Sequence, residues 1–238
     1  MLHDERRGDV ALLTIDRPDR RNAVDHDTLL AIGGALDRAA SDRVRAIVLT
    51  GAGGHFCAGA DLKGLEDAGF ATVLRGVLDA LTSVPAATIA AVDGAALGAG
   101  TQLASFCDLR VATPRATFGI PAAKLGLMVD ANTVARVVAL AGAGPAREML
   151  LAAGTIDGSR AHALGFVQRV GELADALAWA EEIARLAPLT IAGHKLTLER
   201  PADDPAVAEA FTRAWTSDDL HEGRAAFAER RPPRFSGS

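Results

Sequence analysis

Two glycine-rich segments of this sequence have the residue types that place backbone amides around a small ligand. Ala58 to Asp61 reads Ala-Gly-Ala-Asp, and Gly94 to Gly100 reads Gly-Ala-Ala-Leu-Gly-Ala-Gly. Each follows a short apolar run and precedes a helix-like stretch, where the first amides have no partner within the helix. Two such amides at one point would stabilise charge that develops on an oxygen. The pattern predicts an oxyanion-type site, although a tight strand-to-helix turn alone uses the same residues.

The elements around these segments alternate between strands and helices. Short apolar runs predict strands at 10–16, 46–51, 87–92 and 109–112. Helical spacing predicts helices at 25–41, 64–83 and 98–106. Alternation with crossover connections favours an α/β fold with a largely parallel sheet. After Pro121 we expect helices only, at 131–141, 145–152, 159–164, 172–186, 189–198, 204–215 and 218–230.

The composition limits the kind of protein. The 238 residues are enough for one sizeable core, and 49% of them are hydrophobic. A net charge of −5 argues against nucleic acid or an anionic membrane as the main partner. Cys57 and Cys107 lie in apolar surroundings without metal-ligand spacing, which predicts buried reduced thiols. The charged N-terminus does not resemble a signal peptide, and no apolar run reaches the ~20 residues of a membrane span. We therefore expect a cytoplasmic protein.

Five blocks of the sequence together resemble the enoyl-CoA hydratase/isomerase (crotonase) superfamily. They are Arg17 to Val24 (Arg-Pro-Asp-Arg-Arg-Asn-Ala-Val), Gly51 to Lys63, Ala90 to Leu109, Phe118 to Pro121 (Phe-Gly-Ile-Pro), and the closing Ser217 to Phe235. The resemblance covers nearly the whole chain. It implies a crotonase-like α/β fold, with a ββα spiral core in residues 1–185. Residues 186–238 would then form a helical trimerisation region that also closes the site.

The resemblance also implies a ligand and the residues that bind it. Crotonases bind acyl-CoA thioesters, so coenzyme A enters as part of the ligand, with no other cofactor and no metal. The oxyanion donors carried over are the backbone N–H groups of Ala58 and Ala99. The implied contacts to coenzyme A are Ala60, Asp61 and Leu62 at the adenine, Arg20, Arg21 and Lys63 at the phosphates, and Phe227 and Arg230 from a neighbouring subunit. Any one of these cations could equally belong to a solvated charged face.

Two positions depart from the chemistry of hydratases. Gln102 and Ala122 occupy the places where the resemblance puts the two catalytic glutamates, and we expect both to line the substrate site. A carboxamide does not titrate, and a methyl group offers no proton at all. Each lost acid–base function typically costs ~10²–10⁴-fold in rate. The sequence therefore predicts weak or absent hydratase activity.

Asp130 has two possible roles. It precedes Ala-Asn-Thr-Val-Ala-Arg, which makes it a good helix N-cap. Other crotonases use an aspartate at the matching place as a base or nucleophile, so Asp130 is also a tentative catalytic residue.

Three functions follow from these features. The first is an acyl-CoA-binding protein of fatty-acid metabolism that carries, sequesters or senses thioesters, with a protein of lipid metabolism as a possible partner. The second is an acyl-CoA isomerase, hydrolase or dehalogenase that uses Asp130, and the third is a residual enoyl-CoA hydratase. The resemblance implies a homotrimer or a hexamer in each case, and whether the protein is an enzyme stays open.

Overall fold

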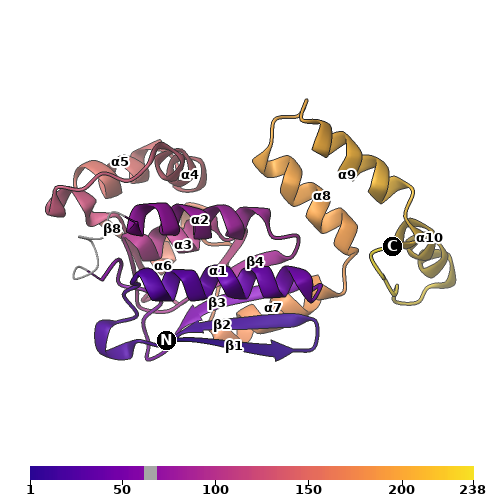
Figure 1. Cartoon of the computed structure of the whole chain (residues 1–238), viewed down its shortest axis with the longest axis horizontal. Helices are drawn as coiled ribbons and strands as arrows, with labels where there is room; N and C mark the ends of the chain where they lie inside the picture. The colour runs from indigo at the N-terminus through magenta and orange to yellow at the C-terminus, as the bar shows by residue number, and fades with distance from the viewer. Residues whose placement is uncertain (62–68) are drawn as a thin grey trace.

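The structure, a computed structural model, describes residues 1–61 and 69–238, which form an α/β core and a helical C-terminal arm (Figure 1). The larger sheet of these residues has the strand order β1-β2-β3-β4-β6-β9. β1 pairs antiparallel with β2, and every other neighbouring pair is parallel. Its strands are β1 (Leu2–Arg7), β2 (Val10–Ile15), β3 (Ala46–Gly51), β4 (Ala87–Val92), β6 (Leu109–Ala112) and β9 (Arg169–Val170).

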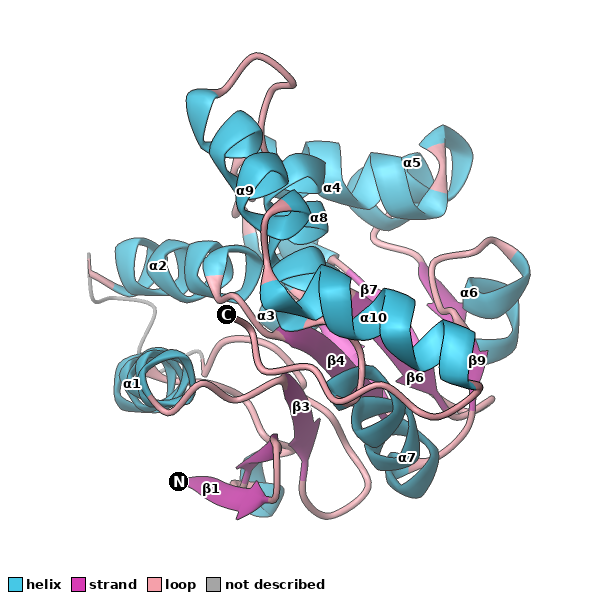
Figure 2. Ribbon diagram, turned by 90° about the vertical axis from the view of Figure 1, so that its right-hand side faces the viewer, coloured by secondary structure: helices cyan, strands magenta, loops and turns pink. Residues whose placement is uncertain are grey.

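Helices cover both faces of this sheet, because its central strands are apolar on both sides. Leu13 of β2 belongs to the core shared with α1 (His26–Ser41) and α2 (Phe70–Ser83). Leu12 faces the other way and packs with α7 (Leu173–Ala184). Figure 2 shows α7 on the opposite side of the strands from α1 and α2. The strands and helices expected around 46–51 and 87–92 are confirmed.

A second, smaller sheet holds the start of the next helix. It consists of β5 (Ala95–Leu97), β7 (Thr117–Gly119) and β8 (Thr155–Asp157), in that order. α3 (Ala99–Phe106) begins immediately after β5 and is buried along its whole length. The Thr101 hydroxyl bonds with both Ala96 and Gly119, which fastens the first turn of α3 to this sheet. The glycine segment at 94–100 therefore has a rigid support.

The remaining helices form the rest of the core surface and the C-terminal arm. The first group is η1 (Pro18–Arg20), η3 (Pro121–Leu125), α4 (Ala131–Ala141), α5 (Ala143–Leu151) and α6 (Gly158–Ala163). The arm consists of α8 (Pro188–Glu199), α9 (Pro205–Trp215) and α10 (Asp218–Glu229). In Figure 1 the arm extends to the right of the sheet, with α10 at its far end. None of the helices in the described ranges is both long and apolar enough to cross a bilayer.

The expectation of helices only after Pro121 is wrong in two places. β8 and β9 are strands of three and two residues, too short to show a period in the sequence. β8 exists because it pairs antiparallel with β7, with Phe118 opposite Ile156. Similarly, β1, β5 and β7 were not expected, since β1 is polar and the other two have three residues each. The predicted helix at 64–83 begins at Phe70 where the structure describes it, and 62–68 lie outside the described residues.

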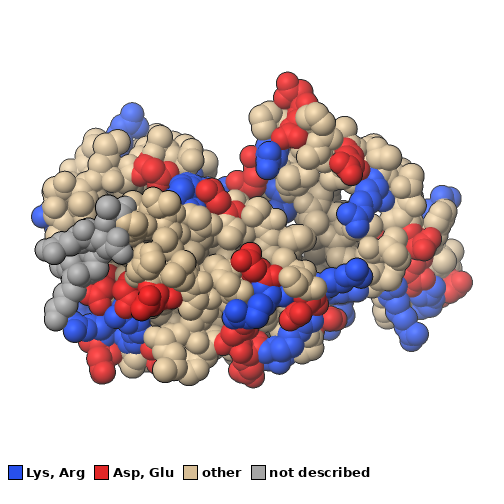
Figure 3. All heavy atoms as spheres, viewed as in Figure 1, with Lys and Arg blue, Asp and Glu red and all other residues tan. Residues whose placement is uncertain are grey.

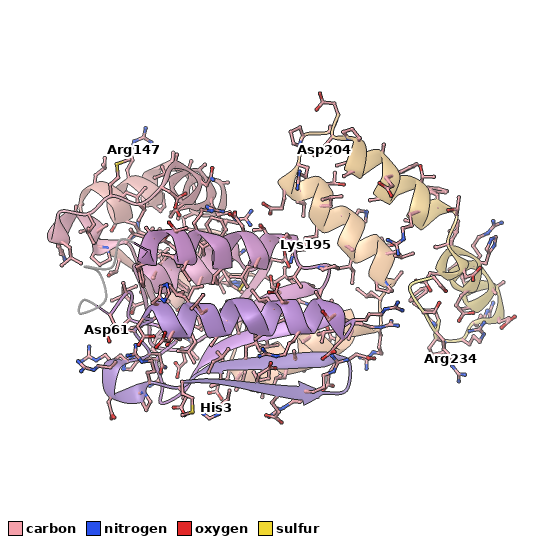
Figure 4. The ribbon with its side chains drawn as sticks, viewed as in Figure 1. His3, Asp61, Arg147, Lys195, Asp204 and Arg234 are labelled. Carbon is pink, nitrogen blue, oxygen red and sulfur yellow. The ribbon has the colours of Figure 1, made fainter. Side chains whose placement is uncertain are left out.

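A buried ion pair connects the arm to the core. Lys195 of α8 is 5% exposed, and its Nζ lies 2.7 Å from Asp108 Oδ2. The same Nζ donates to the carbonyl oxygens of Leu81 and Ala86. Figure 4 shows the Lys195 side chain reaching from α8 toward the core. All three ammonium protons therefore have acceptors, which offsets the cost of burying the charge.

The arm also borders a large hollow. A cavity of about 960 Å³ lies between α2 and α4 on one side and α8 and α9 on the other, and Arg75, Arg136, Lys195 and Arg213 are among its lining residues. Figure 3 shows charged side chains of both signs around the notch between these two parts of the molecule.

Replacing Lys195 with Met should loosen the arm. The substitution leaves the Asp108 carboxylate and two carbonyl groups without their cation, and breaking a buried pair in this way costs about 3 kcal/mol. Urea denaturation would measure the loss of unfolding free energy. Arg160→Met is the control, because the Arg160–Glu148 pair is exposed and its loss should cost under about 1 kcal/mol. Equal losses in both variants would contradict the tethering role of Lys195.

Candidate functional site

The two glycine-rich segments lie side by side. Phe56 N–H donates to Asp93 O at 2.8 Å, Cys57 N–H to Ala95 O at 2.8 Å, and Leu97 N–H to Cys57 O at 2.9 Å. Cys57 and Ala96 thereby form a parallel bridge. Segments 40 residues apart in the sequence meet because both follow the carboxyl ends of the neighbouring strands β3 and β4.

Gly100 allows this close approach. A Cβ at Gly100 would overlap the carbonyl oxygen of Cys57. No side chain fits there without moving the first turn of α3 away from the 55–60 segment. Gly59, with φ at +119°, has a similar constraint, since its Cβ would lie 3.2 Å from Leu97 O. Backbone contact therefore requires glycine at position 100 and, together with the positive φ, favours it at position 59.

The structure corrects one of the two predicted amide donors. Ala58 N–H is donated to Arg21 O at 2.9 Å, so it is not available to a ligand. The next amide on that side belongs to Ala60. Ala60 forms a parallel bridge with Val24, in which Val24 N–H bonds Gly59 O and Asp61 N–H bonds Val24 O. In this pattern the N–H of Ala60 itself points away from Val24.

Ala60 and Ala99, rather than the predicted Ala58 and Ala99, are the two neighbouring amides left without a partner in the described residues. Gly98 N–H is donated to Gly119 O, and Gln102 N–H to Gly98 O, while the amide between them, on Ala99, begins α3. Within residues 1–61 and 69–238, neither the Ala60 nor the Ala99 amide has an acceptor. The register that pairs Cys57 with Ala96 brings Ala60 alongside Ala99. Two unpaired N–H groups at neighbouring positions can hold one oxygen.

Asn22 and Arg17 fasten the Arg-Pro segment to this site. Asn22 is fully buried, and its Nδ2 donates to Ala52 O at 2.7 Å and to His55 O at 2.6 Å. Arg17 lies 3.1 Å from Asp61 Oδ2 and 2.8 Å from Asp25 Oδ2. The sequence did not single out Asn22, which stands between Arg21 and Ala23 in the Arg-Pro block; its left-handed backbone, with φ at +59°, is seen only in the structure.

The residues predicted to contact coenzyme A lie in separate parts of the molecule. Arg20 and Arg21 are exposed, and neither has an ion-pair partner in the part of the chain that the structure describes. Lys63 and Leu62 lie outside the described residues. Phe227 is 87% exposed on α10, and Arg230 is the C-cap of that helix. Figure 4 shows Arg234, which follows α10, on the opposite side of the molecule from Asp61. Within one chain, therefore, α10 does not meet the glycine segments.

Gln102 lies one turn after Ala99 on α3, so the two residues share a helix face. Gln102 is 7% exposed, and Thr133 Oγ1 lies 3.1 Å from its amide oxygen. Ala122 lies on η3, where it is partly buried against the main core. Neither side chain titrates, so the described part of the site holds no carboxylate at these two positions.

Asp130 is the N-cap of α4. Its Oδ1 accepts from Thr133 N–H at 3.0 Å and its Oδ2 from the Thr133 hydroxyl at 2.7 Å, while Arg75 lies 3.3 Å from Oδ1. Partial burial acts to raise the pKa of Asp130, but the Thr133 hydrogen bonds and the Arg75 charge outweigh it and lower the pKa. The capping role is what the structure shows, and such a carboxylate is a weak base.

The thiols behave as the sequence predicted. Cys57 and Cys107 are free and buried. Burial raises the pKa of Cys57 to about 11 and that of Cys107 to about 12, so both stay protonated near neutral pH. In the described ranges no group of three or more His, Cys, Asp or Glu side chains could hold a metal ion.

An α/β core whose paired glycine segments expose two amides, followed by a helical arm, defines a crotonase-type protein. The chain belongs to the enoyl-CoA hydratase/isomerase family, whose model matches residues 5–238. It is 44% identical to the probable enoyl-CoA hydratase echA6 of Mycobacterium bovis, over 96% of this chain and 97% of the relative. It is 33% identical to mouse mitochondrial methylglutaconyl-CoA hydratase, over 99% of this chain and 82% of the relative.

Solved structures have the same fold. An enoyl-CoA hydratase/carnithine racemase from Magnetospirillum magneticum superposes with a TM-score of 0.91 at 30% identity, covering 100% of this chain and 96% of the other. Enoyl-CoA hydratase EchA1 from Mycobacterium marinum superposes with a TM-score of 0.89 at 35% identity, covering 100% and 99%. The fold class expected from the sequence is therefore confirmed.

Gly100→Ala should separate the two segments. The added Cβ overlaps Cys57 O, so we expect a loss of about 1–3 kcal/mol in unfolding free energy, measured by urea denaturation. Gly144→Ala is a matched control, because Gly144 is likewise the second residue of its helix and its Cβ would meet no atom within 4 Å. Gly144→Ala should be neutral or stabilising by about 0.5–1 kcal/mol. A tolerated Gly100→Ala would contradict the close approach.

Asp130→Asn should make the unfolding free energy depend less on pH under acidic conditions. A lowered pKa in the folded state means that the carboxylate stabilises the fold above its usual pKa of 3.8, and that this contribution is lost as pH falls through the lower folded value. Asn keeps the N-cap but cannot titrate. The difference in unfolding free energy between wild type and Asp130→Asn should therefore be present at about pH 7 and shrink below about pH 4. A difference that is unchanged in acid would refute the assignment.

Proposed function

We propose that this protein binds acyl-CoA thioesters with the thioester oxygen held by the backbone amides of Ala60 and Ala99. The single observation that carries the proposal is this pair of unpaired N–H groups, brought side by side by the two glycine segments. Family membership supports the ligand class, since the related proteins are named for acyl-CoA chemistry.

The proposal includes weak or absent hydratase activity. Hydration needs one group to deprotonate water and another to protonate carbon. The sequence resemblance assigns those roles to the positions of Gln102 and Ala122, where neither side chain can exchange a proton. The protein then functions in fatty-acid metabolism by carrying, sequestering or sensing acyl thioesters in the cytoplasm, and a protein partner would receive or read the bound ligand.

An enzyme that uses Asp130 remains the second candidate. An isomerase, hydrolase or dehalogenase would need this carboxylate as a base or nucleophile at the bound acyl group. Its oxygens, however, already accept from the Thr133 amide and hydroxyl, and its pKa is lowered. Both features reduce its basicity, so we rank this candidate below the binding function.

We also propose how the rest of coenzyme A is bound. The exposed Arg20 and Arg21, and Lys63, supply positive charge for its phosphates, which a chain of net charge −5 needs locally. Ala60, Asp61 and Leu62 border the adenine. Phe227 and Arg230 belong to α10 and its C-cap, and Figure 1 shows α10 at the far end of the arm, so we assign them to the site of a neighbouring subunit in a trimer or hexamer, with residues 186–238 forming the contacts.

A comparison of two ligands tests the amide pair. Decanoyl-CoA should bind about threefold to tenfold more tightly than the thioether S-decyl-CoA, which has no carbonyl oxygen to accept the two hydrogen bonds. Isothermal titration calorimetry measures both dissociation constants, and free coenzyme A serves as the control for the phosphate and adenine contacts. Equal affinity for the two ligands would mean that Ala60 and Ala99 do not bind the thioester oxygen.

The same preparation should hydrate crotonyl-CoA very slowly. With both acid–base groups missing, the rate should be ~10⁴-fold or more below that of an ordinary hydratase, and Gln102→Glu with Ala122→Glu should raise it. Rapid turnover by the wild type would overturn the binding-only proposal. In that case Asp130→Asn decides whether Asp130 is responsible, since loss of turnover with unchanged affinity for decanoyl-CoA would identify it as the catalytic group.

A further inference from the structure

Gln102 and Asp130 are connected through a single hydroxyl group. Thr133 is fully buried, and its Oγ1 lies 2.7 Å from Asp130 Oδ2 and 3.1 Å from the amide oxygen of Gln102. Both neighbouring atoms are oxygens that can accept, but a hydroxyl has only one proton to donate. Thr133 can therefore satisfy one of them as a donor and must meet the other as an acceptor.

The carboxylate takes the proton. A hydrogen bond to an ionised acceptor is roughly twice as strong as one between neutral groups, and the bond to Asp130 is the shorter of the two. The lowered pKa of Asp130 keeps it ionised near neutral pH. At the other contact, Gln102 must then be the donor, because two oxygens at 3.1 Å with no proton between them repel.

A half turn of the carboxamide satisfies this requirement. The NH₂ group and the oxygen of a carboxamide exchange places when it rotates by 180°, at almost no change in shape. With the NH₂ group donating to Thr133, the carbonyl oxygen of Gln102 points to the other side. Thr133 is the hydrogen-bond partner of the Gln102 carboxamide in the described ranges, and the second amide atom is not among the sealed, unpartnered atoms there, so it retains some contact with solvent.

The side that this carbonyl oxygen faces is next to the proposed thioester site. Gln102 follows Ala99 by three residues on α3, and side chains at this spacing lie roughly 5–6 Å apart on one helix face. A ligand whose carbonyl oxygen is bound by the Ala99 amide therefore places its next few acyl carbons within reach of the Gln102 carboxamide.

We propose that Thr133 is a positioning residue that holds the Gln102 carboxamide with its carbonyl oxygen toward the acyl group. The site then favours thioesters with a hydrogen-bond donor near the carbonyl, such as 3-hydroxyacyl thioesters, over their 3-oxo counterparts. This inference rests on the proposed acyl-CoA binding, and it identifies the class of acyl group that the site recognises.

A second aspartate–threonine helix cap in this fold provides a control for the role of Thr133. On α1, Asp25 is the N-cap and Thr28 stands three residues later, with its N–H at 2.9 Å and its hydroxyl at 2.6 Å from Asp25 Oδ1. Asp130 and Thr133 are bonded in a similar way, except that the Thr133 N–H and hydroxyl go to different carboxylate oxygens, and the Asp25 cap has no glutamine as third partner. Thr28→Val and Thr133→Val therefore each remove a bond from a threonine hydroxyl to a capping aspartate. Only Thr133→Val also removes the hydroxyl that contacts the Gln102 carboxamide.

The test measures binding of 3-hydroxydecanoyl-CoA, 3-oxodecanoyl-CoA and decanoyl-CoA by calorimetry. The wild type should bind the 3-hydroxy ligand about fivefold to twentyfold more tightly than the 3-oxo ligand. In Thr133→Val this ratio should fall to about one, because the freed carboxamide can turn to accept from a hydroxyl or donate to a ketone. Thr133→Ser and Thr28→Val should keep the wild-type ratio, and affinity for decanoyl-CoA should change less than about twofold in all of them.

Asp130→Ala is a second test variant, in which the preference between the 3-hydroxy and 3-oxo thioesters should reverse. Without the carboxylate, the Thr133 hydroxyl is free to donate to Gln102, so the NH₂ group turns toward the ligand and the preference should reverse in favour of the 3-oxo thioester. A purely structural role of Thr133 would not reverse a preference. This variant also tests the proposal if Thr133→Val does not fold.

The outcomes separate this inference from the proposed function. If the wild type binds decanoyl-CoA but shows no preference, or if the preference survives in both Thr133→Val and Asp130→Ala, the positioning role is refuted while acyl-CoA binding stands. If the wild type binds none of the three thioesters, the proposed function fails, and the inference fails with it.

Discussion

The site depends on the direct backbone pairing of two segments that follow neighbouring parallel strands. Hydrogen bonds from Phe56, Cys57 and Leu97 join the segment after β3 to the segment after β4, and they set the register that brings Ala60 beside Ala99. Main-chain groups at this distance leave no room for side chains, which is why Gly100 faces Cys57 O without a Cβ. The position of α3, and with it that of Gln102, follows from this pairing.

The surrounding polar groups keep the pairing in place at a considerable cost in desolvation. Asn22 is fully buried, and its side chain bonds to three backbone groups: it accepts from Arg17 N–H and donates to Ala52 O and His55 O. Lys195 does the same for the arm, with three acceptors around one ammonium group. Buried polar groups with all their partners specify one arrangement, because any other arrangement leaves some of them unpaired.

A site of this kind separates binding from proton transfer. Backbone amides hold an oxygen whatever the neighbouring side chains are, so oxyanion binding does not require a carboxylate at 102 or 122. What those side chains control is the acyl group next to the carbonyl. In the proposed site that control falls to the Gln102 carboxamide, whose orientation follows from the single proton of Thr133 and the charge of Asp130. The proposed loss of hydratase chemistry and the proposed ligand preference thus have one physical origin.

Much of this protein follows from its sequence alone. Apolar runs such as 46–51 and 87–92 predict strands buried on both faces, and both are found. Asp130 before a helical stretch offers a cap because its short carboxylate can reach the free amides of the first turn, and the structure shows that role. The glycines at 59, 98 and 100 predict tight strand-to-helix turns whose backbone a ligand can approach closely.

The tertiary structure decided what no local pattern contains. Ala58 and Ala60 have the same side chain two residues apart, and only the pairing with Arg21 and Val24 determines which of their amides is left for a ligand. The same holds for β8, which is a strand only because β7 lies beside it, and for Thr133, whose hydroxyl meets Gln102 from 31 residues away. Which groups of distant segments hydrogen-bond to one another depends on the completed fold. Periodicity, helix caps and turns, in contrast, depend on neighbours in the chain.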